Sequence, residues 1–215
     1  MAKKKIYVVR KGRKPGFYDS WAECQKNVTG FKGAEFKSFL TMADAEAYMN
    51  DERASVDDLD SSKPFAFVDG SFNKPEGRYG WGGFLVENGK RHIIAGHGED
   101  PELASVWNIA GELMGASEAM KKAEELGLSE ISILYDYVGI EEWAKENFKT
   151  NGKKYVEDYV SLYKKTLDKV DIKFVKVKGH SGIEGNEDAD AIARFEAGVS
   201  IEEKHRKILE KYNLI

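Results

Sequence analysis

Residues 64–99 read PFAFVDGSFNKPEGRYGWGGFLVENGKRHIIAGHGE, and this stretch sets the architecture of most of the chain. Its apolar and aromatic runs favour three consecutive antiparallel strands, and the pair Asn88 and Gly89 is typical of a tight hairpin turn between the second and the third. Residues 107–126 then carry apolar side chains at helical spacing and end before Gly127, a residue type common just past a helix.

The chain after this helix alternates between strands and helices. Strands are expected at 131–136 and 172–179, and helices at 139–148, 155–170, 186–197 and 200–212. Three antiparallel strands followed by this alternation predict a mixed α/β sheet with helices on its faces. The helix at 200–212 has an apolar stripe and oppositely charged pairs four residues apart, so we interpret it as a packing helix without a catalytic role.

The first 49 residues differ from the rest in charge and predict a separate module. They carry ten Lys or Arg and five Asp or Glu, whereas residues 50–215 carry 23 and 32. Residues 50–63 are rich in Asp and Ser and lack aromatic side chains, which is typical of a flexible linker. We therefore expect a basic module at 1–49, a linker at 50–63 and a second domain at 64–215. Within the module, strands are expected at 6–10 and 34–39, and helices at 20–28, opened by a Ser20 and Glu23 capping pattern, and at 41–49.

The composition excludes several classes of protein. No apolar run reaches the roughly 18 residues of a membrane span, and the basic N-terminus runs into IYVVR without an apolar signal segment, so we expect a cytoplasmic protein without membrane contact. The single cysteine, Cys24, excludes an internal disulfide framework and is expected to be a small buried side chain. The chain has no CxxC or HExxH spacing, so we expect no zinc site of those kinds.

Four acidic residues stand in surroundings that favour burial. Asp69 and Asp136 interrupt the runs FAFVDG and SILYDY at the ends of two expected strands, where ligands gather in sheets of this kind. Glu112 lies among small and apolar residues in NIAGELMGA, and Asp190 lies one turn into a later helix. Because burying unpaired carboxylates is costly, we expect bound cations to neutralise them. All-oxygen ligands favour a hard ion such as Mg²⁺.

The stretch KGHSGIEGNEDADAIAR at 178–194 surrounds Asp190 with further polar groups. His180 lies on a glycine-flanked loop and is suited to proton transfer near neutral pH. Glu184, Glu187 and Asp188 are interpreted as a solvated face that the helix dipole favours, with Asn186 as the cap. Two Mg²⁺ ions about 4 Å apart at the four acids would activate a water and stabilise the leaving oxygen of a phosphodiester.

The segments FVDGSF, NIAGELMGA, ILYDY and VKGHSGIEGNEDADAIAR, in this order, resemble type 1 ribonuclease H. The stretch IYVVRKGRKPGFYDSWAECQKNVTGFKGAEFKSF resembles the hybrid-binding, viroplasmin-like domain that some bacterial members carry at the N-terminus. The resemblance implies a three-layer ribonuclease H-like α/β fold with a mixed five-stranded sheet, plus a small α+β N-terminal domain. It also implies a monomeric endonuclease that cuts the RNA strand of RNA/DNA hybrids and leaves 3′-hydroxyl and 5′-phosphate ends.

The resemblance assigns roles to individual residues. It makes Asp69, Glu112, Asp136 and Asp190 the ligands of two Mg²⁺ ions, for which Mn²⁺ can substitute, and makes His180 an aid to water activation or product release. Ser71 and Asn108 occupy places that sense the 2′-hydroxyls of RNA. In the N-terminal domain, the resemblance places Trp21 and Phe36 against deoxyribose and Lys37 against phosphate, and it implies double-stranded RNA as a second ligand. The chain departs from the family pattern at Ser38, Trp107 and Ile109.

Basic runs strengthen the link to a polyanion. Residues 3–5 read KKK and residues 10–14 read RKGRK, and such runs supply salt-dependent attraction to phosphates. The catalytic part of the chain is acidic and lacks a comparable run, so we expect the module at 1–49 to hold the substrate near the active site through the linker.

Taken singly, each candidate residue has a simpler interpretation. Asp69 before Gly70 is typical of a turn, Asp136 of a helix cap, and Trp21 and Phe36 of a core. Only their joint occurrence in order favours catalysis. Two other classes of function stay open: a non-catalytic protein that binds hybrids or double-stranded RNA through residues 1–49, and a nuclease of the same sheet architecture that cuts DNA, such as a resolvase or transposase.

Overall fold

The computed structural model describes residues 5–39, 42–50, 59–177 and 184–215. Contacts divide the chain into two units, Met1–Arg53 and Ala54–Ile215, and each unit is described by itself. Within the described ranges, no helix combines the length and the apolar composition that crossing a bilayer requires.

The smaller unit is a three-stranded antiparallel sheet with two helices. Strand β1 (Ile6–Lys11) lies between β2 (Gly16–Tyr18) and β3 (Glu35–Phe39), and the helices are α1 (Trp21–Val28) and α2 (Met42–Asn50). The expected cap is confirmed, because the Ser20 hydroxyl accepts a hydrogen bond from the Glu23 N–H at 3.3 Å. Cys24 is buried, as expected. The sequence pattern does not predict β2, because three residues are too few to show a period.

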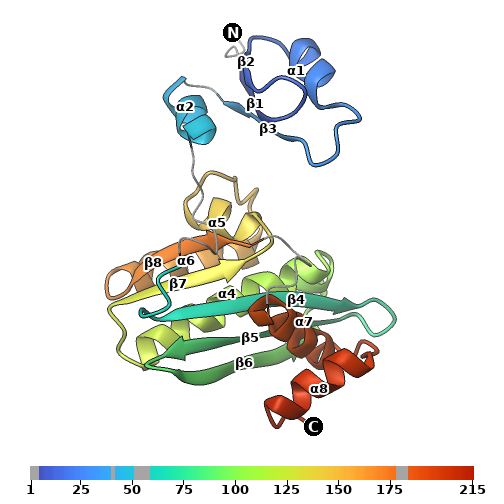
Figure 1. Cartoon of the computed structure of the whole chain (residues 1–215), viewed down its shortest axis with the longest axis vertical. Helices are drawn as coiled ribbons and strands as arrows, with labels where there is room; N and C mark the ends of the chain where they lie inside the picture. The colour runs from blue at the N-terminus through green and yellow to red at the C-terminus, as the bar shows by residue number, and fades with distance from the viewer. Residues whose placement is uncertain (1–4, 40–41, 51–58, 178–183) are drawn as a thin grey trace. The chain divides into compact units, whose positions relative to one another are not determined.

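The larger unit contains a five-stranded sheet in the order β6-β5-β4-β7-β8 (Figure 1). The first three strands form the expected antiparallel meander, and the last two run parallel to β4. Asn88 and Gly89 have φ values of 50° and 75° and join the paired residues Glu87 and Lys90, which confirms the hairpin turn. The strands are β4 (Phe65–Asn73), β5 (Arg78–Glu87), β6 (Lys90–Gly98), β7 (Glu130–Tyr135) and β8 (Asp171–Lys176).

Helices cover both faces of this sheet (Figure 1). They are α3 (Pro101–Ala104), α4 (Asn108–Glu125), α5 (Gly139–Ala144), α6 (Lys154–Leu167), α7 (Glu184–Glu196) and α8 (Glu203–Lys211). Val68 packs with Leu113 of α4, whereas its neighbour Phe67 packs with Ala189 of α7. Because successive strand residues point to opposite faces, α4 and α7 lie on opposite sides. The three-layer α/β arrangement with a mixed sheet is therefore confirmed.

Several details of the helices differ from the sequence-based expectation. The sequence pattern does not predict α3, and α6 ends at Leu167 rather than at residue 170. Helix α5 ends at Ala144 rather than near residue 148, because Glu146 has a positive φ of 56° and the Phe148 N–H turns back to the Glu142 carbonyl at 3.0 Å. Asn186 is not a cap, because it lies inside α7 and is buried.

Helix α7 lies unusually close to strand β5. A Cβ atom on Gly82 would lie 2.1 Å from the Ala193 nitrogen, and one on Gly80 would lie 2.4 Å from the Ala197 nitrogen. Only glycine on the strand permits this approach, and the alanines on the helix complete it. The repeated glycines of β5 thus set the depth of α7, and with it the depth of Asp190.

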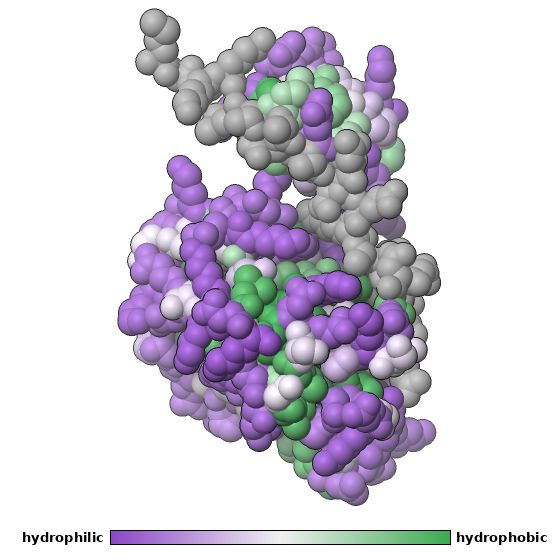
Figure 2. Space-filling view, turned by 90° about the vertical axis from the view of Figure 1, so that its left-hand side faces the viewer, coloured by the Kyte–Doolittle hydropathy of each residue, from purple (hydrophilic) through white to green (hydrophobic). Residues whose placement is uncertain are grey.

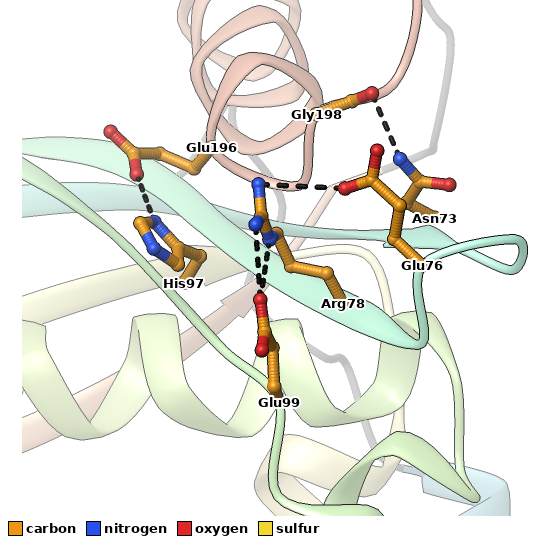
Figure 3. A network of polar contacts seen from close by, with 7 residues as sticks. All are labelled: Asn73, Glu76, Arg78, His97, Glu99, Glu196 and Gly198. Atoms are coloured by element: carbon orange, nitrogen blue, oxygen red, sulfur yellow. Dashed lines mark hydrogen bonds and ion pairs between the residues drawn. The ribbon is translucent and has the colours of Figure 1, made fainter.

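A polar network fastens the C-terminal end of α7 to the sheet (Figure 3). The Asn73 amide donates to the Gly198 carbonyl at 2.9 Å, and His97 Nδ1 lies 3.0 Å from a Glu196 carboxylate oxygen. Arg78 lies between two acids, 3.0 Å from Glu99 and 3.5 Å from Glu76. Exposed pairs of this kind each contribute little to stability. The contacts of Asn73 and His97 join the end of α7 to the sheet, and Arg78 links the residues beside them.

Helix α8 is tied to α7 by a buried carboxylate. Asp188 is 2% exposed, and it accepts from the Tyr212 hydroxyl and from Lys211 Nζ at 2.9 Å. Arg91 Nη1 of β6 lies 3.5 Å away. The interpretation of Asp188 as a solvated residue is therefore wrong, because cations and a hydroxyl from outside its own helix compensate its burial. Glu187 is exposed as expected, and the Glu184 side chain lies outside the described residues.

On the face of the larger unit shown in Figure 2, hydrophilic residues surround a band of hydrophobic ones.

Candidate active site

The candidate site lies where the direction of strand pairing changes. Strand β4 pairs antiparallel with β5 along its length but parallel with β7 only over Phe65–Phe67, so β4 continues past the end of its neighbour. Asp69 lies in this free stretch, and Asp136 directly follows the last residue of β7. Ligands commonly bind at such switch points in open α/β sheets.

Glycines next to the acids bring Glu112 to the same place. A Cβ on Gly70, beside Asp69, would lie 2.4 Å from the Glu112 nitrogen. A Cβ on Gly111, beside Glu112, would lie 2.1 Å from the Gly80 carbonyl oxygen. The backbones of α4 and the sheet therefore touch at these glycines, and this contact sets the separation of the two carboxylates.

Gly111→Ala is expected to lower the free energy of unfolding by about 3 kcal/mol and to reduce activity, because the added methyl pushes α4 off the sheet. Gly115→Ala, one turn further along α4, is the matched control: its Cβ would lie 3.2 Å from the Val68 Cβ, and alanine improves helix propensity by about 1 kcal/mol. Urea unfolding and a cleavage assay of both variants provide the measurement. Equal stability of the two variants would refute the backbone contact.

The three acids form one compact group. Among the residues that the structure describes, one carboxylate oxygen each from Asp69, Glu112 and Asp136 lie within 4.8 Å of one another. Asp69 accepts a hydrogen bond from the Gly70 N–H at 2.7 Å. Glu112 is 1% exposed, and its Oε2 atom has no hydrogen-bond partner within the described ranges. Three acids from distant parts of the chain thus meet at one point, and one oxygen of the buried Glu112 is unsatisfied.

Burial makes Asp69 and Glu112 hold protons tightly. Desolvation raises the pKa of Asp69 to about 8, and the charges of Asp136 and Asp190 add to the effect. Desolvation also raises the pKa of Glu112 well above its usual value, followed by the charges of Asp69 and Asp136. Ionising the group without a cation is therefore costly. Its all-oxygen donors and its unsatisfied oxygen fit a hard divalent cation such as Mg²⁺.

Asp190 borders this group from α7. Its carboxylate lies outside the 4.8 Å group but is close enough for its charge to raise the pKa of Asp69. Nε2 of His205, on α8, lies 3.6 Å from Asp190 Oδ2. Burial lowers the pKa of His205 below its usual value, although Asp190 opposes the shift.

The other expected site residues have mixed outcomes. Ser71 lies on β4 two residues after Asp69 and is partly buried, and Asn108 is the exposed first residue of α4. His180 lies outside the described residues. Trp107, just before Asn108, is 60% exposed with a strained φ of 56°.

Sequence reasoning missed two residues beside the acids. Tyr137 directly follows Asp136, and burial raises the pKa of its hydroxyl, with the charge of Glu112 as the next cause. Its position next to Asp136 was the available signal. His205 has no such signal, because only the packing of α8 on α7 brings it to Asp190.

The smaller unit exposes some of its large aromatic side chains. Phe17, Trp21 and Phe36 are each 42–43% exposed, and the rings of Trp21 and Phe36 lie 5.6 Å apart. The simpler interpretation of Trp21 and Phe36 as core residues is therefore wrong. Lys37, which is partly buried, lies with its Nζ 5.6 Å from the centre of the Phe39 ring.

Two arginines of the basic run also hold the smaller unit together. Arg10 pairs with Glu35 at 2.5 Å, and Arg13 donates to the carbonyls of Lys26 and Thr29. Part of this run therefore serves the structure of the unit itself.

Known protein families match both parts of the chain. Residues 62–198, more than half of the chain, match the family described as RNase H. The chain belongs to the ribonuclease H family. Residues 5–49 match the domain described as the ribonuclease H1 N-terminal domain. The acids Asp69, Glu112, Asp136 and Asp190 all fall inside the ribonuclease H match, whereas His205 falls after it.

Similar proteins agree with this membership. The chain is 26% identical to ribonuclease H1 of Homo sapiens over an alignment of 252 residues, gaps included, and the alignment covers 88% of each chain. It is 30% identical over 142 residues to ribonuclease H of Chlorobium phaeobacteroides (strain DSM 266 / SMG 266 / 2430), covering 61% of this chain and 93% of that one. The N-terminal RNase H domain of a Mycobacterium tuberculosis protein, solved as a fusion with maltose-binding protein, shares the fold at a TM-score of 0.50, with 18% identity over 64% of this chain and 95% of that one.

Membership in the ribonuclease H family makes this protein a nuclease that acts on RNA/DNA hybrids. The N-terminal domain match accords with nucleic-acid binding by the smaller unit.

Proposed function

We propose that this ribonuclease H hydrolyses the RNA strand of RNA/DNA hybrids endonucleolytically at the site formed by Asp69, Glu112, Asp136 and Asp190, leaving 3′-hydroxyl and 5′-phosphate ends. The observation that carries the proposal is the meeting of three carboxylate oxygens within 4.8 Å, from residues distant in the sequence. Like charges so close are stable only when protons or cations neutralise them.

In this proposal, different residues bind the metal ions, contact the RNA and transfer the proton. Asp69 and Asp136 supply oxygens at the end of the sheet, Glu112 supplies a buried oxygen from the side of α4, and Asp190 supplies one from α7. Two Mg²⁺ ions bound by these acids would activate the attacking water and stabilise the leaving oxygen, and Mn²⁺ would substitute. Ser71 and Asn108 flank the acids and are the proposed donors and acceptors for the 2′-hydroxyls, and His180 is the proposed proton carrier.

The test compares substrates and metals. The protein is incubated with end-labelled RNA/DNA hybrid, double-stranded RNA and duplex DNA, each with Mg²⁺, with Mn²⁺, and with chelator. We expect the hybrid alone to be cut efficiently, only with metal, and the products to be substrates for a ligase that requires a 5′-phosphate. Equal cutting of duplex DNA would favour the resolvase-like alternative, and metal-dependent binding without cutting would favour a non-catalytic binding protein.

We further propose that the exposed aromatic cluster of the smaller unit, Trp21 and Phe36, binds the hybrid, and that residues 50–63 link it to the catalytic domain. Large exposed aromatic side chains in close ring contact are suited to packing against sugars and bases. Lys37, which follows Phe36 on β3, is the proposed contact to phosphate. Double-stranded RNA is the expected second ligand, and the enzyme is expected to act as a monomer.

Trp21→Ala is expected to weaken hybrid binding about tenfold, because a stacking contact is worth about 1–3 kcal/mol. The slope of affinity against salt should stay the same, because no charge is removed. Fluorescence anisotropy with a labelled hybrid in chelator measures both quantities in the full chain. Met42→Ala, an exposed apolar residue of α2 in the same unit, is the control. Equal affinity of both variants would exclude the aromatic cluster as a binding surface.

A further inference from the structure

Helix α8 follows the part of the chain that matches the ribonuclease H family, yet it carries a buried histidine to one of the candidate metal ligands. The family match ends at residue 198, and α8 spans Glu203–Lys211. His205 is 4% exposed, and its Nε2 lies 3.6 Å from Asp190 Oδ2. Asp190 and His205 line the same small pocket together with Asn186, Glu187, Lys204 and Ile208. A side chain of α8 therefore forms part of the wall next to Asp190.

The backbone of α8 selects the tautomer of this histidine. His205 Nδ1 lies 3.1 Å from the Glu202 backbone nitrogen. A backbone N–H can only donate, so Nδ1 accepts and carries no proton. The neutral ring then carries its proton on Nε2, the atom that faces Asp190. The distance of 3.6 Å is slightly longer than a hydrogen bond, and contacts of this kind are often long before substrate binds.

Several contacts hold His205 in this place. Leu209, one turn further along α8, is fully buried, and Asp188 of α7 binds Lys211 and Tyr212 at the end of the same helix. Asp188 and Asp190 lie two residues apart on α7. The contacts of Asp188 with Lys211 and Tyr212, and the contact of Asp190 with His205, therefore join the same two helices. The ring is therefore placed by the fold and not by its contact with Asp190.

We propose that His205 is a positioning residue, whose Nε2–H orients the Asp190 carboxylate for metal binding. The proposal rests on the proposed function, in which Asp190 is a metal ligand. Carboxylates that bind metals are commonly oriented by hydrogen bonds from a surrounding shell, and loss of such a partner typically lowers metal affinity 10–100-fold. The helix α8 thereby contributes to the active site, although its sequence is that of a packing helix.

Two substitutions separate this role from the helix cap. His205→Asn keeps an acceptor near the position of Nδ1 for the Glu202 N–H but removes the donor toward Asp190. His205→Gln places an amide N–H near the position of Nε2 but removes the acceptor for Glu202. We expect Asn to weaken Mn²⁺ binding about tenfold with little change in thermal stability, and Gln to keep nearly native Mn²⁺ affinity while lowering the melting temperature by about 3 °C.

Mn²⁺ alone is the probe, and the electron paramagnetic resonance signal of the free ion measures binding to the full chain without substrate. Asp190→Asn and Leu209→Ala are the references, the first for loss of the ligand and the second for a destabilised α8 with the contact intact. Weaker binding by Asp190→Asn and His205→Asn, with native affinity in His205→Gln and Leu209→Ala, supports the proposal. Native Mn²⁺ affinity in His205→Asn, or losses that follow thermal stability across the variants, overturns it. Native affinity in Asp190→Asn would instead refute Asp190 as a ligand, and with it that part of the proposed function.

Discussion

Asp136→Asn is expected to lower kcat for hybrid cleavage by about 10³-fold or more. The amide has no charge and binds a hard cation poorly, so several kcal/mol of metal-derived charge stabilisation is lost, and each 1.36 kcal/mol corresponds to about tenfold in rate. Hybrid affinity should change little, because the proposed aromatic binding surface lies in the other unit. Initial rates on end-labelled hybrid at saturating Mg²⁺, together with a dissociation constant measured in chelator, separate the two effects.

Asp158→Asn is the matched control for this prediction. Asp158 is an exposed residue of α6 that pairs with Lys154 at 2.7 Å, so its loss removes the same charge far from the carboxylate group in sequence and at a solvated surface. We expect the control to cleave at the native rate. A rate for Asp136→Asn within tenfold of the control would remove this residue from the catalytic set.

The metal-free protein is expected to become less stable as the pH rises from about 5 to about 8. Asp69 has a pKa of about 8 in the folded protein, against about 3.9 in an unfolded chain, and the pKa of Glu112 is raised as well. The folded state therefore holds protons that the unfolded state has released. This stabilisation is complete below about pH 4 and is lost as the pH rises through the folded pKa, with a total on the order of several kcal/mol.

Mg²⁺ should reverse this dependence, because a bound cation stabilises the ionised acids of the folded state alone. At 100 times the dissociation constant, binding adds about 3 kcal/mol. Urea unfolding from pH 5 to pH 9, in chelator and in Mg²⁺, measures both effects. Asp69→Asn should flatten the metal-free dependence and weaken the Mg²⁺ effect. The same pH slope in the native protein and in Asp69→Asn would show that Asp69 does not hold a proton in the folded state.

Most of the elements were predictable because their signals are local. The apolar and aromatic runs of β4 and β5, the Asn88 and Gly89 turn, and Gly127 after α4 each depend on residues close together in the chain. The errors occur where the sequence carries no such local signal. Strand β2 is too short to show a period, and α5 ends at Ala144, just before Glu146, whose positive φ no helical pattern signals.

The acids of the site could be named from the sequence for a related reason. Asp69, Glu112 and Asp136 each stand among apolar or small residues, and a carboxylate in such surroundings needs a partner. The glycines beside Asp69 and Glu112 are also visible in the sequence, but their purpose is not. Only the fold shows that Gly70, Gly80 and Gly111 let the backbones of α4 and the sheet touch.

The sequence by itself predicted most of the elements, the mixed sheet and the four candidate acids, because these follow from short-range patterns and from their order along the chain. Only the tertiary structure decided which neighbouring side chains compensate the charge of each acid. Asp188 looks like Asp190 in the sequence, yet one is compensated by Lys211 and Tyr212 and the other faces His205 and the site. That difference depends on the packing of α8 on α7, and the energy of a buried charge is set by neighbours in space rather than by neighbours in the chain.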